Sequence, residues 1–216
     1  MKQLSIPFIP LKKSKRAKSP LQAIDIEPWG SDELTTCTAA FTISHFNEGL
    51  RIQYFVTEPF LRVKKRKING GVHKDNCVEF FLAFENESDY YNFEFNCLGS
   101  IKAGYGSGRK NRTHLPPDVV RDIENSMAIT LNNINDGKLI QWEITIILPL
   151  RIFCFHNKPS FSGLNCSANF AKCGDNLPSP HFLSWVNIIS IKPDFHQPSC
   201  FGKLSFETQS VFNTCL

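Results

Sequence analysis

Apolar and polar residues alternate with a period of two over most of the chain after residue 22, and turn-forming residues interrupt the alternation every 8–15 residues. In YYNFEFN at 90–96, for example, aromatic residues alternate with Asn92, Glu94 and Asn96. A period of two places successive side chains on opposite faces of a strand, and many short strands separated by turns are typical of a sandwich or barrel. The pattern therefore predicts an all-β fold.

Three segments carry further structural signals: 77–85, 139–148 and 116–126. CVEFFLAFE at 77–85 is apolar on both faces, which predicts a central strand, and LIQWEITIIL at 139–148 follows NNINDG, which predicts a hairpin with 127–131. Residues 116–126 have room for a turn or two of helix, after a Gly- and Pro-rich basic loop at 104–118. The expected strands are 38–46, 50–58, 77–85, 89–100, 127–131, 139–148, 166–170, 182–188 and 200–207.

The 216 residues are enough for one sizeable core. We expect a basic arm at 1–22 that packs little, a single domain at 23–210 and a short tail at 211–216. Pro7 and Pro10 interrupt the apolar N-terminus, so as written the chain is expected to be cytoplasmic. Removal of an export signal would instead make it a periplasmic or secreted protein.

The net charge of +4 comes largely from two basic runs, at 11–19 and 62–67. Such runs are usually solvated, and no nucleic-acid-binding motif accompanies them, so no nucleic-acid partner is expected. No apolar stretch reaches the roughly 18 residues that cross a membrane, so no membrane partner is expected. The eight cysteines form no CxxC pair, and the pattern favours reduced thiols buried in strands, Cys77, Cys97 and Cys154 among them.

The polar positions of the expected strands carry mainly acids and amides. Such side chains accept and donate hydrogen bonds in the way that polyhydroxylated ligands require, although an ordinary solvated face would also explain them. The residues expected on this outward face are Gln53, Glu79, Asn92, Glu94, Asn96, Gln141 and Glu143.

Four motifs occur in a fixed order: NCVEFFLAF at 76–84, YYNFEFNCLG at 90–99, LNCSANFAKCGD at 164–175 and PDFHQPSCFGKLSFE at 193–207. Together they resemble family 9 carbohydrate-binding modules over residues 23–208, and especially the free-standing proteins of this type from gut Bacteroidetes. The resemblance implies an antiparallel β-sandwich, immunoglobulin-like or jelly-roll-like as in DOMON domains. It also implies non-catalytic sugar binding linked to breakdown of xylan-type polysaccharides, with calcium in some members.

In this family two tryptophans clasp a sugar ring, and their positions correspond to His73 and Phe195 here. The acid of the family's VE motif corresponds to Glu79, and an acid three residues earlier is replaced by Asn76. Glu94 stands where the family has an arginine. Asn96 and Asn169 match asparagines of the family.

NFAKCGDNLPSPHFLSW at 169–185 would form one rim of such a site. Lys172 and Asp175 are its polar loop residues, with a surface ion pair as the alternative interpretation, and Trp185 is its indole candidate. The ligand set expected for a mono- or oligosaccharide is therefore His73, Asn76, Glu79, Glu94, Asn96, Asn169, Lys172, Asp175, Trp185 and Phe195.

Three alternatives remain from the residues themselves. Glu79 and Glu94, with Glu143 on the same expected face, could act as the paired carboxylates of a glycoside hydrolase. Cys173 with His181 or His196 could form a nucleophile pair or, with Asp175, bind metal, but the spacing matches no closed zinc motif, so neither a catalytic residue nor a metal ligand is expected. A sandwich that has lost sugar binding and serves as an interaction module is the third.

Overall fold

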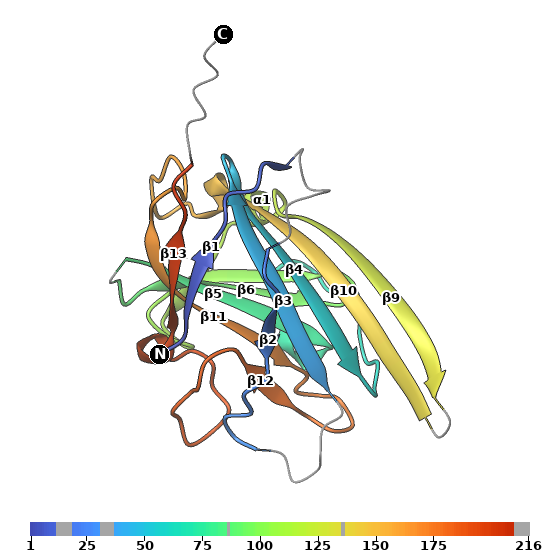
Figure 1. The fold of residues 1–216 in the computed structure, drawn as a ribbon. Coiled ribbons are helices and arrows are strands. Elements are labelled where there is room, and N and C mark those ends of the chain that lie inside the picture. The colour runs from blue at the N-terminus through green and yellow to red at the C-terminus, as the bar shows by residue number, and fades with distance from the viewer. Residues whose placement is uncertain (12–18, 31–36, 86, 135–136, 210–216) are drawn as a thin grey trace.

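The protein is a β-sandwich of two sheets, seen in a computed structural model that describes residues 1–11, 19–30, 37–85, 87–134 and 137–209 (Figure 1). The strands of the small sheet run obliquely across those of the large sheet. The small sheet contains β2 (Gln22–Ile24), β3 (Thr38–Phe46), β4 (Gly49–Glu58), β9 (Glu124–Ile134) and β10 (Gly137–Pro149). The large sheet contains β1 (Gln3–Ile6), β5 (Cys77–Phe84), β6 (Tyr90–Asn96), β7 (Ile101–Gly106), β8 (Arg112–His114), β11 (Asn165–Cys173), β12 (Phe182–Ser184) and β13 (Gly202–Phe206).

The order of the large sheet is β1-β13-β11-β5-β6-β7-β8, with β12 paired to β11, and that of the small sheet is β2-β3-β4-β10-β9. The pairs are antiparallel except for β1 with β13. The apolar strand β5 lies in the middle of its sheet, and β9 and β10 form a hairpin, so both of these predictions are confirmed. Short helices are α1 (Pro117–Val120), η2 (Val72–Lys74), η3 (Leu150–Ile152) and η4 (Pro198–Cys200). No helix in the described ranges is long and apolar enough to cross a membrane.

The core between the sheets is aromatic. Phe41 of the small sheet stacks on Phe170 of the large sheet, with their ring centroids 3.6 Å apart, and Phe80 stacks on the same ring at 5.0 Å. The buried hydroxyl of Tyr54 crosses the core and donates to the carbonyl of Glu79 at 2.8 Å. Trp142 is also buried here, as its register predicts.

The N-terminal segment differs from the prediction of an arm that packs little. β1 pairs with β13, Phe8 pairs with His45, and the side chains of Ile6 and Ile9 are buried. The strand is short and followed by Pro7, so its alternation is too brief to recognise, yet its backbone covers the edge of β13. Most of the basic run 11–19 and the tail 211–216 lie outside the described residues.

Two further expectations need correction. Residues 101–106 and 112–114 form β7 and β8, so the expected loop at 104–118 is largely sheet and turn, although a helical turn does occupy 117–120. The seven cysteines in the described ranges are all free thiols. Five of them are buried as predicted, but Cys154 is exposed.

The expected single polar face is divided between the two sheets. Gln53, Gln141 and Glu143 belong to β4 and β10 of the small sheet, whereas Glu79 and Glu94 belong to β5 and β6 of the large sheet. Glu143 therefore cannot join the other two glutamates in one site. Alternation within each strand is correct, but sequence does not reveal which strands share a sheet.

Candidate functional site

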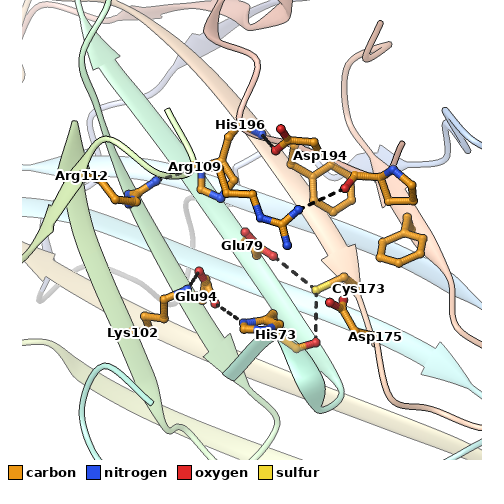
Figure 2. Close-up of a pocket in the computed structure, with 13 residues that line it drawn as sticks. His73, Glu79, Glu94, Lys102, Arg109, Arg112, Cys173, Asp175, Asp194 and His196 are labelled. Carbon is orange, nitrogen blue, oxygen red and sulfur yellow. Dashed lines mark hydrogen bonds and ion pairs between the residues drawn. The ribbon is translucent and has the colours of Figure 1, made fainter. Parts of the chain in front are cut away.

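A pocket lies on the face of the large sheet that is turned away from the small sheet (Figure 2). Its walls come from η2, from the turn between β7 and β8, from the chain around β12 and from residues 193–196. The cavity measures about 170 Å³. The side chains on the sheet itself are Glu79, Glu94, Lys102, Arg112 and Cys173.

The register of β5 and β6 places Glu79 directly opposite Glu94, and both carboxylates are buried. Lys102 donates to Oε1 of Glu94 at 2.6 Å, and Nδ1 of His73 lies 3.5 Å from Oε2. Burial alone would raise the pKa of Glu94, but His73 and Lys102 outweigh it and hold this pKa below its usual value. The interaction with Glu94 raises the pKa of His73 in turn.

Glu79 has a different environment. Its Oε2 accepts a hydrogen bond from Asn92 at 3.2 Å, and its Oε1 accepts one from the Cys173 thiol at 3.3 Å. Burial, with the nearby charge of Glu94, raises the pKa of Glu79 to about 7. Below about pH 7, therefore, Glu79 is mainly protonated while the adjacent Glu94 is ionised.

Arg112 reaches over the sheet from β8. Its guanidinium lies 5.5 Å from the centre of the Tyr90 ring, and its Nη1 donates to Nδ1 of His196 at 2.8 Å. Burial and the charge of Arg112 lower the pKa of His196 to about 3, so this imidazole is neutral and can accept that bond. A Cβ at Gly104 would lie 3.0 Å from Nε of Arg112, so glycine gives the side chain the room it needs here.

Two buried polar atoms of the pocket residues have no hydrogen-bond partner within the described ranges: Nη2 of Arg112, and Oε2 of Glu94, which has only the longer ion pair with His73. Buried polar groups are normally paired, and leaving one unpaired costs about 1–3 kcal/mol. The pocket therefore offers a ligand one hydrogen-bond acceptor and one hydrogen-bond donor on the sheet. Their partners would be ligand atoms that can both donate and accept.

The raised pKa of Glu79 gives a testable pH dependence. Between about pH 4.5 and about pH 7 the unfolded chain loses the proton of Glu79 while the folded protein keeps it. The folded state then binds more protons, so the free energy of unfolding falls as pH rises through this window and levels off above it. Urea unfolding at several pH values should show a shallower fall in Glu79→Gln than in the unaltered protein. A parallel profile for the two proteins would show that Glu79 is ionised throughout.

The structure brings five of the ten expected ligand residues together around the pocket: His73, Glu79, Glu94, Asp175 and Phe195. The two positions of the family's clasping tryptophans, His73 and Phe195, therefore line one cavity. Phe195 is only 6% exposed and packs against Trp29 at 5.2 Å, so it presents little surface for stacking.

The other five are buried elsewhere: Asn76, Asn96, Asn169, Lys172 and Trp185. Asn76 bonds the backbone of Arg62 and Phe60, and Asn96 bonds Lys64 and Asp75, so both asparagines fasten the segment before β5. Asn169 does lie on the pocket side of its strand.

β12 pairs with β11 next to Asn169. The amide of Asn169 is bonded to Ser184 and to the backbone of Val186, and Trp185 is only 1% exposed in the core. Neither side chain forms part of the pocket.

Lys172 is neither a rim residue nor half of a surface ion pair. It is fully buried between the sheets, with its ammonium 3.0 Å from Glu58 and 2.9 Å from Nε2 of His181. Trp142 donates to the other oxygen of Glu58 at 2.6 Å. Lys172 and Phe170 lie two residues apart on one strand, so both side chains point into the core. The sequence does not indicate that the distant Glu58 carboxylate lies there to pair with the lysine.

Sequence reasoning missed the basic side of the pocket. Arg109 and Arg112 come from the segment expected as a basic loop at 104–118, and Lys102 lies just before it. Asp194 and His196 come from the motif at 193–207, where His196 was considered only as a partner of Cys173. The glycines of GYGSGRKNR were the available signal. Gly106 has φ +151°, and a Cβ there would meet the backbone of Asn111, so the strand pair that presents Arg112 depends on it.

The family resemblance raises calcium as a candidate cofactor. Calcium takes six to eight oxygen ligands. In the described part of the chain, two groups of His, Cys and acidic side chains are close enough to hold an ion, namely Cys37, Glu58 and His181, and Cys77, Glu79 and Cys173. Each contains thiols and only one carboxylate, so neither fits calcium.

A sequence profile described as carbohydrate-binding family 9 matches residues 11–206. The chain belongs to this family. A structure from Bacteroides uniformis, described as a candidate carbohydrate-binding protein, is 30% identical with a TM-score of 0.83, over 95% of this chain and 99% of that one. No curated protein is significantly similar in sequence.

Two structures of a family 9 module from Caldicellulosiruptor kristjanssonii, one with glucose and one with cellotriose, match at 15% identity and a TM-score of 0.53. They cover 97% of this chain and, respectively, 98% and 96% of the module. At this identity the two matches show that this chain and the Caldicellulosiruptor module share the same β-sandwich fold.

Proposed function

We propose that this protein binds a saccharide in the pocket on the large sheet and does not change it chemically. The observation that carries the proposal is the pair of buried atoms without a hydrogen bond, Nη2 of Arg112 and Oε2 of Glu94, in a member of a carbohydrate-binding family; Oε2 has only the ion pair with His73 at 3.5 Å. A sugar hydroxyl donates to a carboxylate and accepts from a guanidinium, so neighbouring hydroxyls of one ring would satisfy both atoms. Lys102 and Arg109 add further donors at the edge.

The size of the pocket favours one sugar ring. Its volume of about 170 Å³ lies below the roughly 300–1,000 Å³ typical of sites for larger organic ligands. The imidazole of His73 and the edge of Phe195 would flank the ring where the family has tryptophans, with less apolar area than indole offers. Binding would therefore depend on hydrogen bonds more than on stacking. Glucose and cellotriose are the first ligands to test, because the two structures of the Caldicellulosiruptor module were determined in complex with them.

The test is a glycan array that includes cello- and xylo-oligosaccharides, followed by calorimetric titration of each hit. Glu94→Gln removes the charged acceptor with little change of shape, and we expect a 10- to 100-fold weaker affinity, since hydrogen bonds to charged groups contribute about 1.5–3 kcal/mol. Arg112→Gln should weaken binding to a similar degree.

Glu143→Gln is the matched control, because Glu143 lies exposed on the small sheet and should leave the affinity unchanged. Equal affinities for the unaltered protein, Glu94→Gln and Arg112→Gln would place the binding site elsewhere.

A second candidate function, glycoside hydrolysis, rests on the opposite pKa shifts of Glu79 and Glu94. Paired carboxyls in different protonation states are the arrangement that hydrolases use. However, the ion pairs with Lys102 and His73 keep Glu94 ionised, and Glu79 is only 5% exposed, so neither carboxyl is placed as an accessible proton donor. Sustained turnover of a chromogenic glycoside that is lost in Glu94→Gln would establish hydrolysis and overturn the non-catalytic proposal.

A further inference from the structure

Two thiols and a carboxyl group lie close together at the pocket, where Glu79 and Cys173 line the cavity. The register of β5 and β11 places Cys77 directly opposite Cys173, and Glu79 follows two residues after Cys77 on the same face. Their three donor atoms all lie within 4.8 Å of one another, and the Cys173 sulfur is 3.3 Å from Oε1 of Glu79. Figure 2 shows Glu79 and Cys173 pointing toward each other at the edge of the cavity.

We propose that Cys77, Glu79 and Cys173 form a binding site for a thiophilic divalent cation of the zinc class. Tetrahedral zinc holds sulfur at about 2.3 Å and carboxylate oxygen at about 2.0–2.2 Å, which separates neighbouring ligand atoms by roughly 3.4–3.8 Å. The three donor atoms lie within 4.8 Å of one another, so side-chain rotations that draw them together would bring them to this spacing. Two thiolates select against calcium and magnesium, which prefer oxygen ligands.

The surroundings support a built site. The exposed fractions of Cys77, Glu79 and Cys173 are 0%, 5% and 1%, so the donors are held by the sheet and not by mobile surface chains. Asn92 donates to Oε2 of Glu79 at 3.2 Å and thereby turns Oε1 toward the sulfurs, as outer hydrogen bonds do for metal-binding carboxylates. Glu79 and Cys173 also line the pocket, so the fourth coordination position faces it and is open to water or a ligand oxygen.

A second cluster of similar composition, in the core, already contains a cation of the protein. Cys37, Glu58 and His181 are equally close, but the ammonium of Lys172 lies 3.0 Å from Glu58 and 2.9 Å from His181. A cation is thus already provided there by the protein. No lysine or arginine forms an ion pair with Glu79 within the described ranges, so the pocket cluster has room for a metal.

Cobalt(II) titration of the fully reduced protein tests the proposal, because thiolate ligands give Co²⁺ a near-ultraviolet charge-transfer absorption. We expect this band in the unaltered protein, its displacement by Zn²⁺, and its loss in Cys77→Ser and in Cys173→Ser. Cys166→Ser is the control, since Cys166 lies on the same strand as Cys173 but faces the core, and it should keep the band. Glu79→Gln keeps both thiols and should bind more weakly.

Absence of the band from the folded, reduced, unaltered protein would overturn the proposal. So would a band that persists in both serine variants, or one that Glu79→Gln leaves at full affinity. Far-ultraviolet circular dichroism identifies any variant that fails to fold, and the unaltered protein alone already decides the first outcome. Saccharide binding is measured separately, so either proposal can fail without the other.

Discussion

Lys172→Met is expected to lower the free energy of unfolding by about 3–5 kcal/mol, one of the two largest effects that the structure predicts. Glu58 and Lys172 are both fully buried, and the ion pair holds the pKa of Glu58 down to about 2 in spite of burial, which by itself would raise it. Methionine fits the volume but removes the cation, which leaves the carboxylate charged and unpaired in a place that water does not reach.

Urea unfolding measures this loss, and two further proteins make it interpretable. In Lys158→Met, an exposed pair with Glu85 is broken, and we expect a change of about 0–1 kcal/mol. Glu58→Gln combined with Lys172→Met removes the charge but keeps an acceptor for Trp142, so it should recover part of the loss. A cost below about 1 kcal/mol for Lys172→Met would contradict the buried pair.

Phe170→Ala is expected to cost a similar amount, about 3–5 kcal/mol, because it opens a cavity where the two sheets meet. The Phe170 ring stacks on Phe41 and Phe80 and meets the edge of Trp185 at 5.6 Å, so no single neighbour can fill the space. Phe155→Ala is the control, since Phe155 is 49% exposed, and we expect a change below about 1 kcal/mol. Similar unfolding midpoints for the two variants would contradict the proposed packing of the sheets.

Local alternation predicted the fold well wherever a strand was long. Residues 77–84 and 90–96 were expected as strands, and their register puts Glu79 opposite Glu94. β1 escaped prediction because four residues before a proline carry too little pattern. β7 and β8 escaped because their glycines, which make room for Arg112, are also typical of loops.

The candidate site was only half visible in the sequence. Glu79 and Glu94 followed from the alternation of polar positions, and His73 and Phe195 from family resemblance. Arg112 enters the pocket only because β8 pairs with β7. Residues on one face of a strand can also have different roles. Asn96 and Glu94 share one face of β6, but the oxygen of the Asn96 side chain accepts hydrogen bonds from the backbone of the turn that follows. Whether a polar side chain lines the pocket depends on which distant segments pack against its face of the sheet. Periodicity within one strand carries no information about those segments.

The most direct test of the central claim is a crystal structure of the protein with the tightest saccharide found on the array. We predict one sugar ring in the pocket between His73 and Phe195, with hydroxyl oxygens within hydrogen-bond distance of Oε2 of Glu94 and Nη2 of Arg112. A saccharide bound elsewhere, with both of these atoms still lacking a hydrogen bond, would contradict the account.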